Sequence, residues 1–199
     1  MVGTNMSDES DTDVPAMTRY PVPDVDDLPD DVRERIEEEA ERAGFTPNVF
    51  LAYAYLPSHF RAFFGYYDAI TQDSELTKAE IEMIIVATSS ANDCYYCNVA
   101  HGALLRIYSE DPLLADQIVA NHRAADVSDR HRVMLDFAVK LTESPGRVDE
   151  TDMQVMREAG FSDRQIWDVA SVCAFFNLSN RMATVADMRP NAEFHTMGR

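Results

Sequence analysis

The chain has 199 residues, of which 46% are hydrophobic, and this length can bury the core of one globular domain. It carries 35 acidic and 17 basic residues, a formal net charge of −18, and such a surface repels nucleic acids and anionic membranes. We therefore expect neither nucleic acid nor a membrane as a partner.

The basic residues are 15 arginines and only two lysines, Lys78 and Lys140. An acid-rich, lysine-poor surface suits a cytosol of very high salt, where ions screen the self-repulsion of the surface. We therefore expect a halophilic protein. Complete folding and activity without added salt would contradict this expectation.

The sequence also predicts a location. Residues 1–14 are polar and acidic, without the basic and then apolar pattern of a secretory signal. The longest aliphatic run, residues 83–87, is too short to span a bilayer. Three cysteines do not form a disulfide framework, so a reducing cytoplasm is the expected compartment.

Along the chain, residues 1–19 are expected to form a disordered acidic tail, and prolines and aspartates predict an extended strap over residues 20–31. Beyond the strap, helical periodicity dominates and no alternating strand pattern occurs. We expect a single all-helical domain over residues 20–190 and a C-terminal tail over 191–199. The predicted helices span residues 30–43, 47–55, 57–72, 77–91, 94–108, 112–121, 128–142, 149–159 and 162–187.

Several helix boundaries carry recognisable chemistry. Capping boxes are predicted at Thr77 with Glu80 and at Ser162 with Gln165, and Asp111 caps a helix that begins with proline. Helices are expected to end at Gly44, Gly146 and Gly160. The short connections predict an all-α bundle.

The two capping boxes also begin a faint internal repeat with an offset of 85 residues, which pairs Asn92 with Asn177. A chance alignment of two capped helices explains the same pattern. An aromatic stretch over residues 60–67 has helical spacing on more than one face. We attribute it to a helix covered on both sides, one of them by a partner subunit, with an apolar substrate channel as the alternative.

The segment from Asp93 to His101 holds the clearest chemical pattern, two cysteines three residues apart and a histidine four residues further on. On a helix turning about 100° per residue, Cys94, Cys97 and His101 fall within roughly 60° of one another. Cysteines at i and i+3 are close enough for a disulfide. With Asn92-Asp93 as N-cap, Cys94 would lie in the first turn, where the helix dipole favours a thiolate. We therefore predict a dithiol/disulfide redox site with His101 as proton carrier.

Other interpretations of the cysteines stay open. Free cysteines are commonly small apolar core residues, and Cys173 lies in such a stretch. Cysteine and histidine also bind zinc, but Cys173, His122 and His131 show no second paired spacing for a four-ligand site. Glu82, within the apolar residues 81–87, either faces a solvated stripe or is buried with a partner, and if buried it is a candidate proton acceptor.

Glu82, Cys94, Cys97 and His101 fit the pattern E-x11-C-x-x-C-x3-H at every fixed position. On this pattern the chain resembles the alkylhydroperoxidase D-like branch of the carboxymuconolactone decarboxylase family, and within it the peroxidase-related proteins. The likeness covers about residues 20–190. Flanking segments are similar as well: residues 46–48, 56–57, 176–177 and 180–181.

The resemblance implies an all-helical homo-oligomer that reduces hydroperoxides with a thiol. Carried over by position, Cys97 would be the peroxidatic thiol, Cys94 the resolving thiol, and Glu82 with His101 the proton relay. An external dithiol, lipoyl-type or thioredoxin-like, would restore the pair, and no metal or organic cofactor is required. Tyr96 departs from the histidine that this family often places between the cysteines, which puts substrate range and rate in question.

The family's decarboxylases generally lack the cysteine pair, so its presence argues against lactone decarboxylation. Two alternatives stay open on the same scaffold. One is a general disulfide oxidoreductase, and the other is a non-catalytic redox sensor or interaction protein.

Overall fold

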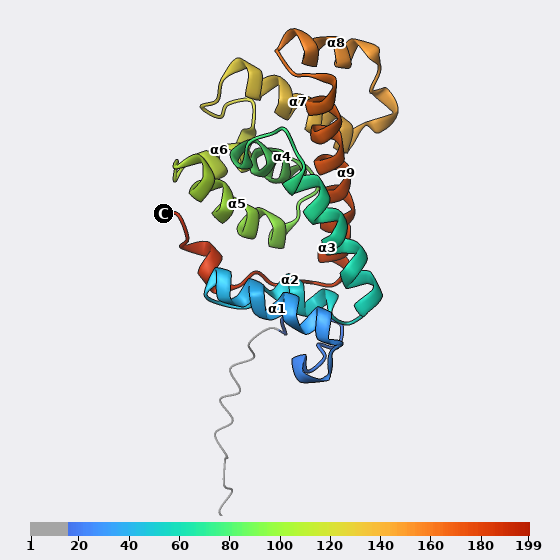
Figure 1. The fold of residues 1–199 in the computed structure, drawn as a ribbon. Coiled ribbons are helices and arrows are strands. Elements are labelled where there is room, and N and C mark those ends of the chain that lie inside the picture. The colour runs from blue at the N-terminus through green and yellow to red at the C-terminus, as the bar shows by residue number, and fades with distance from the viewer. Residues whose placement is uncertain (1–15) are drawn as a thin grey trace, which may run out of the picture.

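The computed structural model describes residues 16–199, and this part of the chain is helical without strands. The first 15 residues, most of the predicted acidic tail, lie outside the described residues. The predicted all-α fold is confirmed (Figure 1). The helices are α1 (Asp30–Ala43), α2 (Asn48–Tyr53), α3 (Pro57–Gln72), α4 (Lys78–Ala91), α5 (Tyr95–Ser109), α6 (Leu114–Asn121), α7 (Asp129–Glu143), α8 (Glu150–Glu158) and α9 (Asp163–Val185), with 3-10 turns η1 (Val25–Asp27), η2 (Pro145–Arg147) and η3 (Ala192–His195).

Helix α4 is the centre of the bundle. It packs against α5, α6, α7 and α9, and ten of its 14 residues are buried. In Figure 1, α1 and α2 lie below α4, α7 and α8 lie above it, and α9 runs to its right. Because α4 is covered on every side, polar residues on it must find partners inside the protein.

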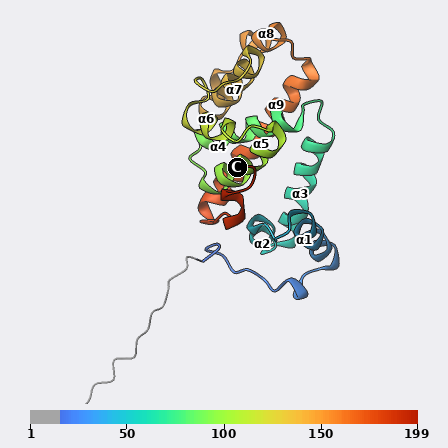
Figure 2. The ribbon, with the colours of Figure 1, turned by 90° about the vertical axis from the view of Figure 1, so that its left-hand side faces the viewer.

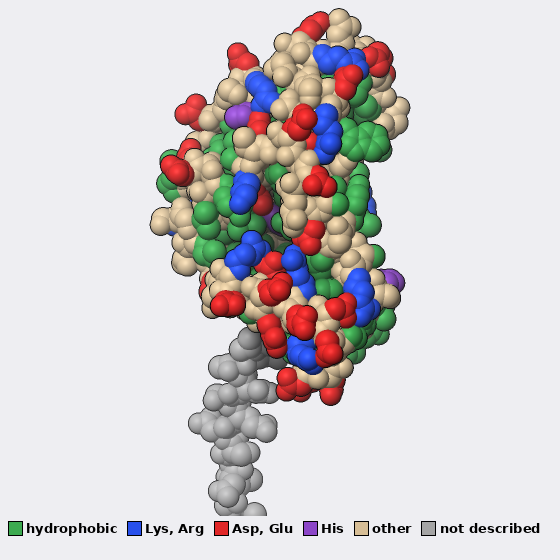
Figure 3. Space-filling view, viewed as in Figure 1, with side chains coloured by type: hydrophobic (Ala, Val, Ile, Leu, Met, Phe, Trp, Pro, Cys, Tyr) green, Lys and Arg blue, Asp and Glu red, His purple; other side chains and the backbone are tan. Residues whose placement is uncertain are grey.

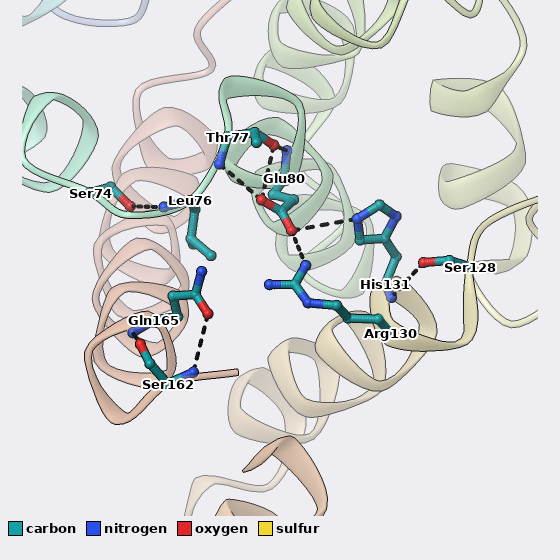
Figure 4. Close-up of polar contacts among 9 residues, drawn as sticks. All are labelled: Ser74, Leu76, Thr77, Glu80, Ser128, Arg130, His131, Ser162 and Gln165. Carbon is teal, nitrogen blue, oxygen red and sulfur yellow. Dashed lines mark hydrogen bonds and ion pairs between the residues drawn. The ribbon is translucent and has the colours of Figure 1, made fainter. Parts of the chain in front are cut away.

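The predicted capping chemistry at the starts of α4 and α9 is confirmed. Thr77 and Glu80 form one capping box, and Ser162 and Gln165 form the other. The two boxes lie near each other in Figure 4, where the Glu80 carboxylate also meets side chains from α7. Gly44 ends α1 with a φ of 80°, a left-handed conformation that glycine adopts without strain.

One predicted helix start was wrong. Asp111 was expected to cap a helix that begins at Pro112, but α6 begins at Leu114. The Asp111 side chain accepts a hydrogen bond from the Leu113 amide, so the chain makes a local turn before the helix begins. The internal repeat stays a prediction, although its paired residues Asn92 and Asn177 lie in contact, with 3.1 Å between Nδ2 and Oδ1.

The aromatic residues of α3 are covered mainly by other helices of the same chain, and a partner subunit on this helix stays a prediction. Phe60 and Phe64 are buried, and Phe64 stacks on Phe50 of α2 at 4.1 Å between ring centroids. Phe63 packs on Phe175 of α9. Of the aromatic residues in this stretch, only Tyr66 is largely exposed. Helices α2 and α9 both pack against α3 and supply the aromatic rings that cover these side chains.

Both ends of the described chain are joined to the bundle. Met17 and Arg19, which precede the strap and belong to the predicted tail, pair with the segment that follows α9. The Arg19 amide donates to Ala186 O, and the Arg189 amide donates to Met17 O. Residues 191–199, set apart as a tail in the sequence analysis, pack against α5, and Figure 2 shows the C-terminus beside that helix. None of the helices within residues 16–199 has the length and apolarity needed to cross a bilayer.

Candidate functional site

The turn between α4 and α5 places the two cysteines. Asn92 is the C-cap of α4, Asp93 adopts a φ of 52°, and Cys94 is the N-cap of α5. The prediction of Asn92-Asp93 as the N-cap was therefore wrong, and Cys94 precedes the first turn instead of lying in it. The linker is only three residues long, and aspartate tolerates the left-handed conformation that reverses the chain here. As a result the Cys94 sulfur, at 3.4 Å, accepts a hydrogen bond from the Cys97 amide.

Cys94 and Cys97 are both reduced, and both are buried. A hydrogen bond from the Cys97 side chain, opposed by burial and reinforced by the Cys97 amide, lowers the pKa of Cys94 to about 7. The same contact and burial raise the pKa of Cys97. One proton of the pair is therefore lost near neutral pH, and the negative charge rests at the N-terminus of α5.

His101 and Glu82 form the second part of the site. The Nδ1 atom of His101 lies 2.8 Å from Oε2 of Glu82, and the glutamate side chain is only 5% exposed. The edge of the imidazole packs against Phe176 of α9, at 4.7 Å between ring centroids. Because Nδ1 is engaged by the carboxylate, Nε2 is the nitrogen left to exchange a proton with a ligand.

An apolar cavity of about 310 Å³ adjoins these groups. Cys97 and His101 lie in its wall, whereas Cys94 does not. The aromatic side chains of α3 that the sequence analysis gave the alternative role of a substrate channel, Phe63, Phe64 and Tyr67, also line it. The cavity therefore presents one sulfur and one imidazole to an apolar molecule.

A second, more polar cavity of about 560 Å³ adjoins the first. It has Glu82 in its wall, and it shares Glu39, Arg42, Tyr67 and Tyr108 with the apolar cavity. Figure 3 shows a hollow above α1 with basic and acidic side chains around its rim. Glu82 thus lies between the imidazole and a polar space, an arrangement that suits exchange of protons with water.

Sequence reasoning missed two side chains from α9. Asn180 and Ser179 are buried, and hydrogen bonding by Asn180 lowers the pKa of both thiols, while Ser179 does so for Cys97 alone. Asn180 is itself held by Ser89 and Asn92, whose side chains it contacts at 3.0 Å each. The available signal was a polar pair within the apolar second half of α9.

A third missed residue is Tyr53 of α2. Its ring stacks on Phe63 at 3.9 Å and packs against the cluster that holds Cys94 and Cys97. Its hydroxyl is buried without a hydrogen-bond partner among the described residues, and burial together with a charge at Cys97 raises its pKa. Tyr96 is buried as well, and its hydroxyl accepts a hydrogen bond from the Val49 amide.

Cys173 is a core residue, as expected. Its sulfur lies 3.3 Å from both Ala138 O and the Thr142 hydroxyl, and burial raises its pKa. Within residues 16–199, no three His, Cys, Asp or Glu side chains are grouped closely enough to hold a metal ion. The zinc alternative therefore has no ligand set in this part of the chain.

The chain is similar to known proteins in sequence and in fold. The carboxymuconolactone decarboxylase family profile matches residues 57–140. A structure described as an alkylhydroperoxidase AhpD core, an uncharacterized peroxidase-related protein from Ralstonia eutropha JMP134, is 55% identical. It superimposes with a TM-score of 0.91 over 92% of this chain and 97% of the other.

A second uncharacterized peroxidase-related protein, from Silicibacter sp. TM1040, is 42% identical, with a TM-score of 0.87 over 98% of this chain and 100% of the other. The debrominase Bmp8 is 18% identical and shares the fold, with a TM-score of 0.73 over 92% of this chain and 95% of the other. No curated protein matches the chain.

Proposed function

Since the chain belongs to the carboxymuconolactone decarboxylase family and is an alkylhydroperoxidase D-like, peroxidase-related protein, we propose that it is a thiol-dependent peroxidase. It would reduce hydroperoxides by cycling Cys94 and Cys97 between dithiol and disulfide. The observation that carries this proposal is that Cys97 and a glutamate-bound imidazole, His101, line the same apolar cavity.

The first step transfers oxygen to sulfur. Cys97 loses its proton to His101, and the resulting thiolate attacks the distal oxygen of the hydroperoxide. The O–O bond breaks, the leaving alkoxide takes a proton from the imidazolium, and Cys97 becomes a sulfenic acid. The peroxide is reduced to an alcohol by two electrons from the sulfur.

The second step closes the disulfide. The Cys94 thiolate attacks the Cys97 sulfenic sulfur, the S–O bond breaks, and the hydroxide leaves as water with a proton that His101 has taken up again from solvent. Glu82 holds the imidazole through Nδ1 and stabilises its protonated form during both steps. An external dithiol, lipoyl-type or thioredoxin-like, then reduces the disulfide by thiol–disulfide exchange and is itself oxidised.

Two features favour different sulfurs as the attacking atom. The lowered pKa favours Cys94, whereas access to the cavity favours Cys97. We assign the attack to Cys97, because a buried sulfur outside the cavity wall does not meet the peroxide, however readily it ionises. Cys94 then serves as the resolving thiol.

The experiment is to measure hydroperoxide consumption by the purified protein with a dithiol such as dihydrolipoamide as electron donor. We expect turnover to be lost in Cys97→Ser and retained in Cys173→Ser, a matched control because Cys173 is equally buried but lies outside the cavity wall. Unchanged turnover in Cys97→Ser would refute the proposal. Intact-mass analysis after one equivalent of peroxide should show a loss of about 2 Da, the two hydrogens released when a disulfide forms.

Two alternatives keep the same thiol pair. A general disulfide oxidoreductase would react with disulfides faster than with peroxides, so the two rates separate it from a peroxidase. A non-catalytic redox sensor or interaction protein would react with peroxide more slowly than a free thiol and capture a partner protein. The homo-oligomer that the family resemblance implies is part of the proposal, and sedimentation or light scattering in solution measures it.

A further inference from the structure

The end of the chain is held against α5 by a buried arginine. Arg106 is 5% exposed, and it donates hydrogen bonds to Phe194 O at 2.8 Å and to Met197 O at 2.9 Å. It forms no salt bridge within the described chain. A buried guanidinium is costly unless hydrogen-bonded, so these two carbonyls stabilise Arg106 and Arg106 in turn fixes their position.

The last two residues fit closely against the same helix. Gly198 has a φ of +71°, and a Cβ atom placed there would lie 2.8 Å from the Arg106 Cβ. Arg199 forms a bidentate ion pair with Asp116 of α6, with its two terminal guanidinium nitrogens 3.0 and 3.1 Å from the two carboxylate oxygens. A glycine is therefore required at position 198 for the chain end to reach this position.

The start of the segment is fixed as well. The Asn191 side chain accepts a hydrogen bond from the Asn48 amide at 2.8 Å and donates one to Thr46 O at 2.9 Å. These contacts join the segment to the N-terminus of α2. Residues 191–199 are thus tied to α2 at one end and to α5 and α6 at the other.

Between these anchors, the segment turns two side chains toward the catalytic thiol. Phe194 and Met197 line the apolar cavity together with Cys97. Phe194 is 6% exposed and packs edge-on against Phe45, at 5.1 Å between ring centroids. Both side chains also belong to the apolar cluster around Cys94 and Cys97.

From this arrangement we propose that residues 191–199 form a specificity-determining wall of the peroxide cavity. Phe194 and Met197 set the size and shape of the apolar group that can reach Cys97, and Arg106 is a positioning residue that holds the wall in place. The inference rests on the proposed function for its choice of substrate. It applies to any molecule that must pass through the cavity to the thiol.

The cavity volume gives the proposal a direction. The cavity has a volume of about 310 Å³. A smaller side chain at position 194 enlarges it, and a larger side chain reduces it. A bulky substrate responds to such a change more strongly than a small one, and contacts of this size alter selectivity by about tenfold. Opposite changes in cavity size should therefore change selectivity in opposite directions.

The first test compares cumene hydroperoxide with hydrogen peroxide. We expect the ratio of their kcat/KM values to rise about tenfold in Phe194→Ala and to fall in Phe194→Trp. Met197→Ala is a second, milder variant should Phe194→Ala fail to fold. Phe161→Ala is the matched control, because Phe161 is equally buried but lies outside the cavity wall, and its ratio should equal that of the wild type.

The second test does not depend on peroxide chemistry. It measures the rates at which Cys97 is alkylated by the large reagent N-pyrenylmaleimide and by the small reagent iodoacetamide, read from peptide masses. The ratio of the large-reagent rate to the small-reagent rate should rise in Phe194→Ala and fall in Phe194→Trp. Arg106→Met should raise this ratio as Phe194→Ala does. The double variant Arg106→Met/Phe194→Ala should show nearly the same ratio as either single variant, because both changes displace the same wall.

Equal ratios in folded Phe194→Ala, Phe194→Trp and wild type would overturn the proposed wall. An additive double variant would overturn the positioning role of Arg106. If the alkylation ratios shift while no form consumes peroxide, the wall is supported and the proposed peroxidase function fails.

Discussion

The Nδ1 atom of His101 lies 2.8 Å from Oε2 of Glu82, although the two residues are 19 positions apart and belong to different helices. The contact is possible because α4 and α5 pack side by side along their length. It fixes which imidazole nitrogen faces the thiol cavity, and it places a carboxylate beside the proton that the reaction must move.

We predict that Glu82→Gln lowers the rate of reaction with hydroperoxide by about 10- to 100-fold, the range for loss of a carboxylate that orients a functional histidine. The amide preserves shape but does not stabilise the protonated imidazole. Stopped-flow measurement of the reduced protein with excess peroxide provides the rate. Glu80→Gln is the matched control on the same helix, and it should leave the rate unchanged. Equal rates in Glu82→Gln and wild type would remove Glu82 from the mechanism.

The two cysteine variants should differ in the intermediate that they accumulate. Cys94→Ser is expected to stop after the first step, so that dimedone labels a sulfenic acid at Cys97. Cys97→Ser should show no label at Cys94 at equal peroxide concentration. Labelling at Cys94 instead would reverse the roles and make the residue with the lower pKa the attacking thiol.

The reactivity of the thiol pair should follow an ionisation near pH 7. Because the pKa of Cys94 is lowered to about 7, the thiolate fraction rises with pH through that value and is nearly complete about one pH unit higher. An unperturbed cysteine titrates near about 8.5. Thiolate absorbance at 240 nm, recorded from acid to alkaline pH, measures the midpoint. A midpoint at the unperturbed value would contradict the charge placement at the start of α5.

Asn180→Leu should raise that midpoint, since hydrogen bonding by Asn180 lowers the pKa of both thiols. Leucine has a similar size but donates no hydrogen bond. Asn177→Leu is the control, because Asn177 belongs to the same polar network through Asn92 but does not bond Cys94 or Cys97. Its sulfur partner is Cys173, so both variants are compared in a Cys173→Ser background. Identical midpoints in the two variants would show that Asn180 acts only through packing.

The free energy of unfolding should depend on pH through the ionisation of Glu80. Burial alone would raise the pKa of Glu80, but hydrogen bonds from His131, Thr77 and Arg130 hold it far below its usual range (Figure 4). A lowered folded-state pKa stabilises the protein above the unfolded value and loses this effect as pH falls through the folded value. Arg130 is partly exposed, so we expect Glu80→Gln to lower the free energy of unfolding by about 1–3 kcal/mol at pH 7.

This difference should narrow as the pH falls below about 4, where the carboxylate of the unfolded chain becomes protonated. Urea unfolding of wild type and variant at several pH values measures it. A difference that stays constant down to pH 3 would show that Glu80 stabilises through packing. Lys78→Gln at the start of the same helix is a control without a buried charge.

Much of the local structure follows from residues near one another in the chain. Capping boxes, glycine ends and apolar periodicity predict the helices to within a few residues, because hydrogen bonds over three or four positions form them. The same range places Cys97 and His101 one turn apart on α5, with Cys94 as the N-cap of that helix. The error at Asp111 arose because its side chain bonds the backbone two residues ahead and delays the helix.

The tertiary structure decided what those residues meet. Packing between segments distant in sequence decides whether Glu82 faces His101 and which sulfur borders the cavity. It also brings Asn180 and Phe194 to the thiols. The periodicity of one helix shows that a face is buried but not what buries it. The chain's own sequence therefore determined the reactive pair, and the packing of α4, α9 and the C-terminal segment determined the environment in which that pair reacts.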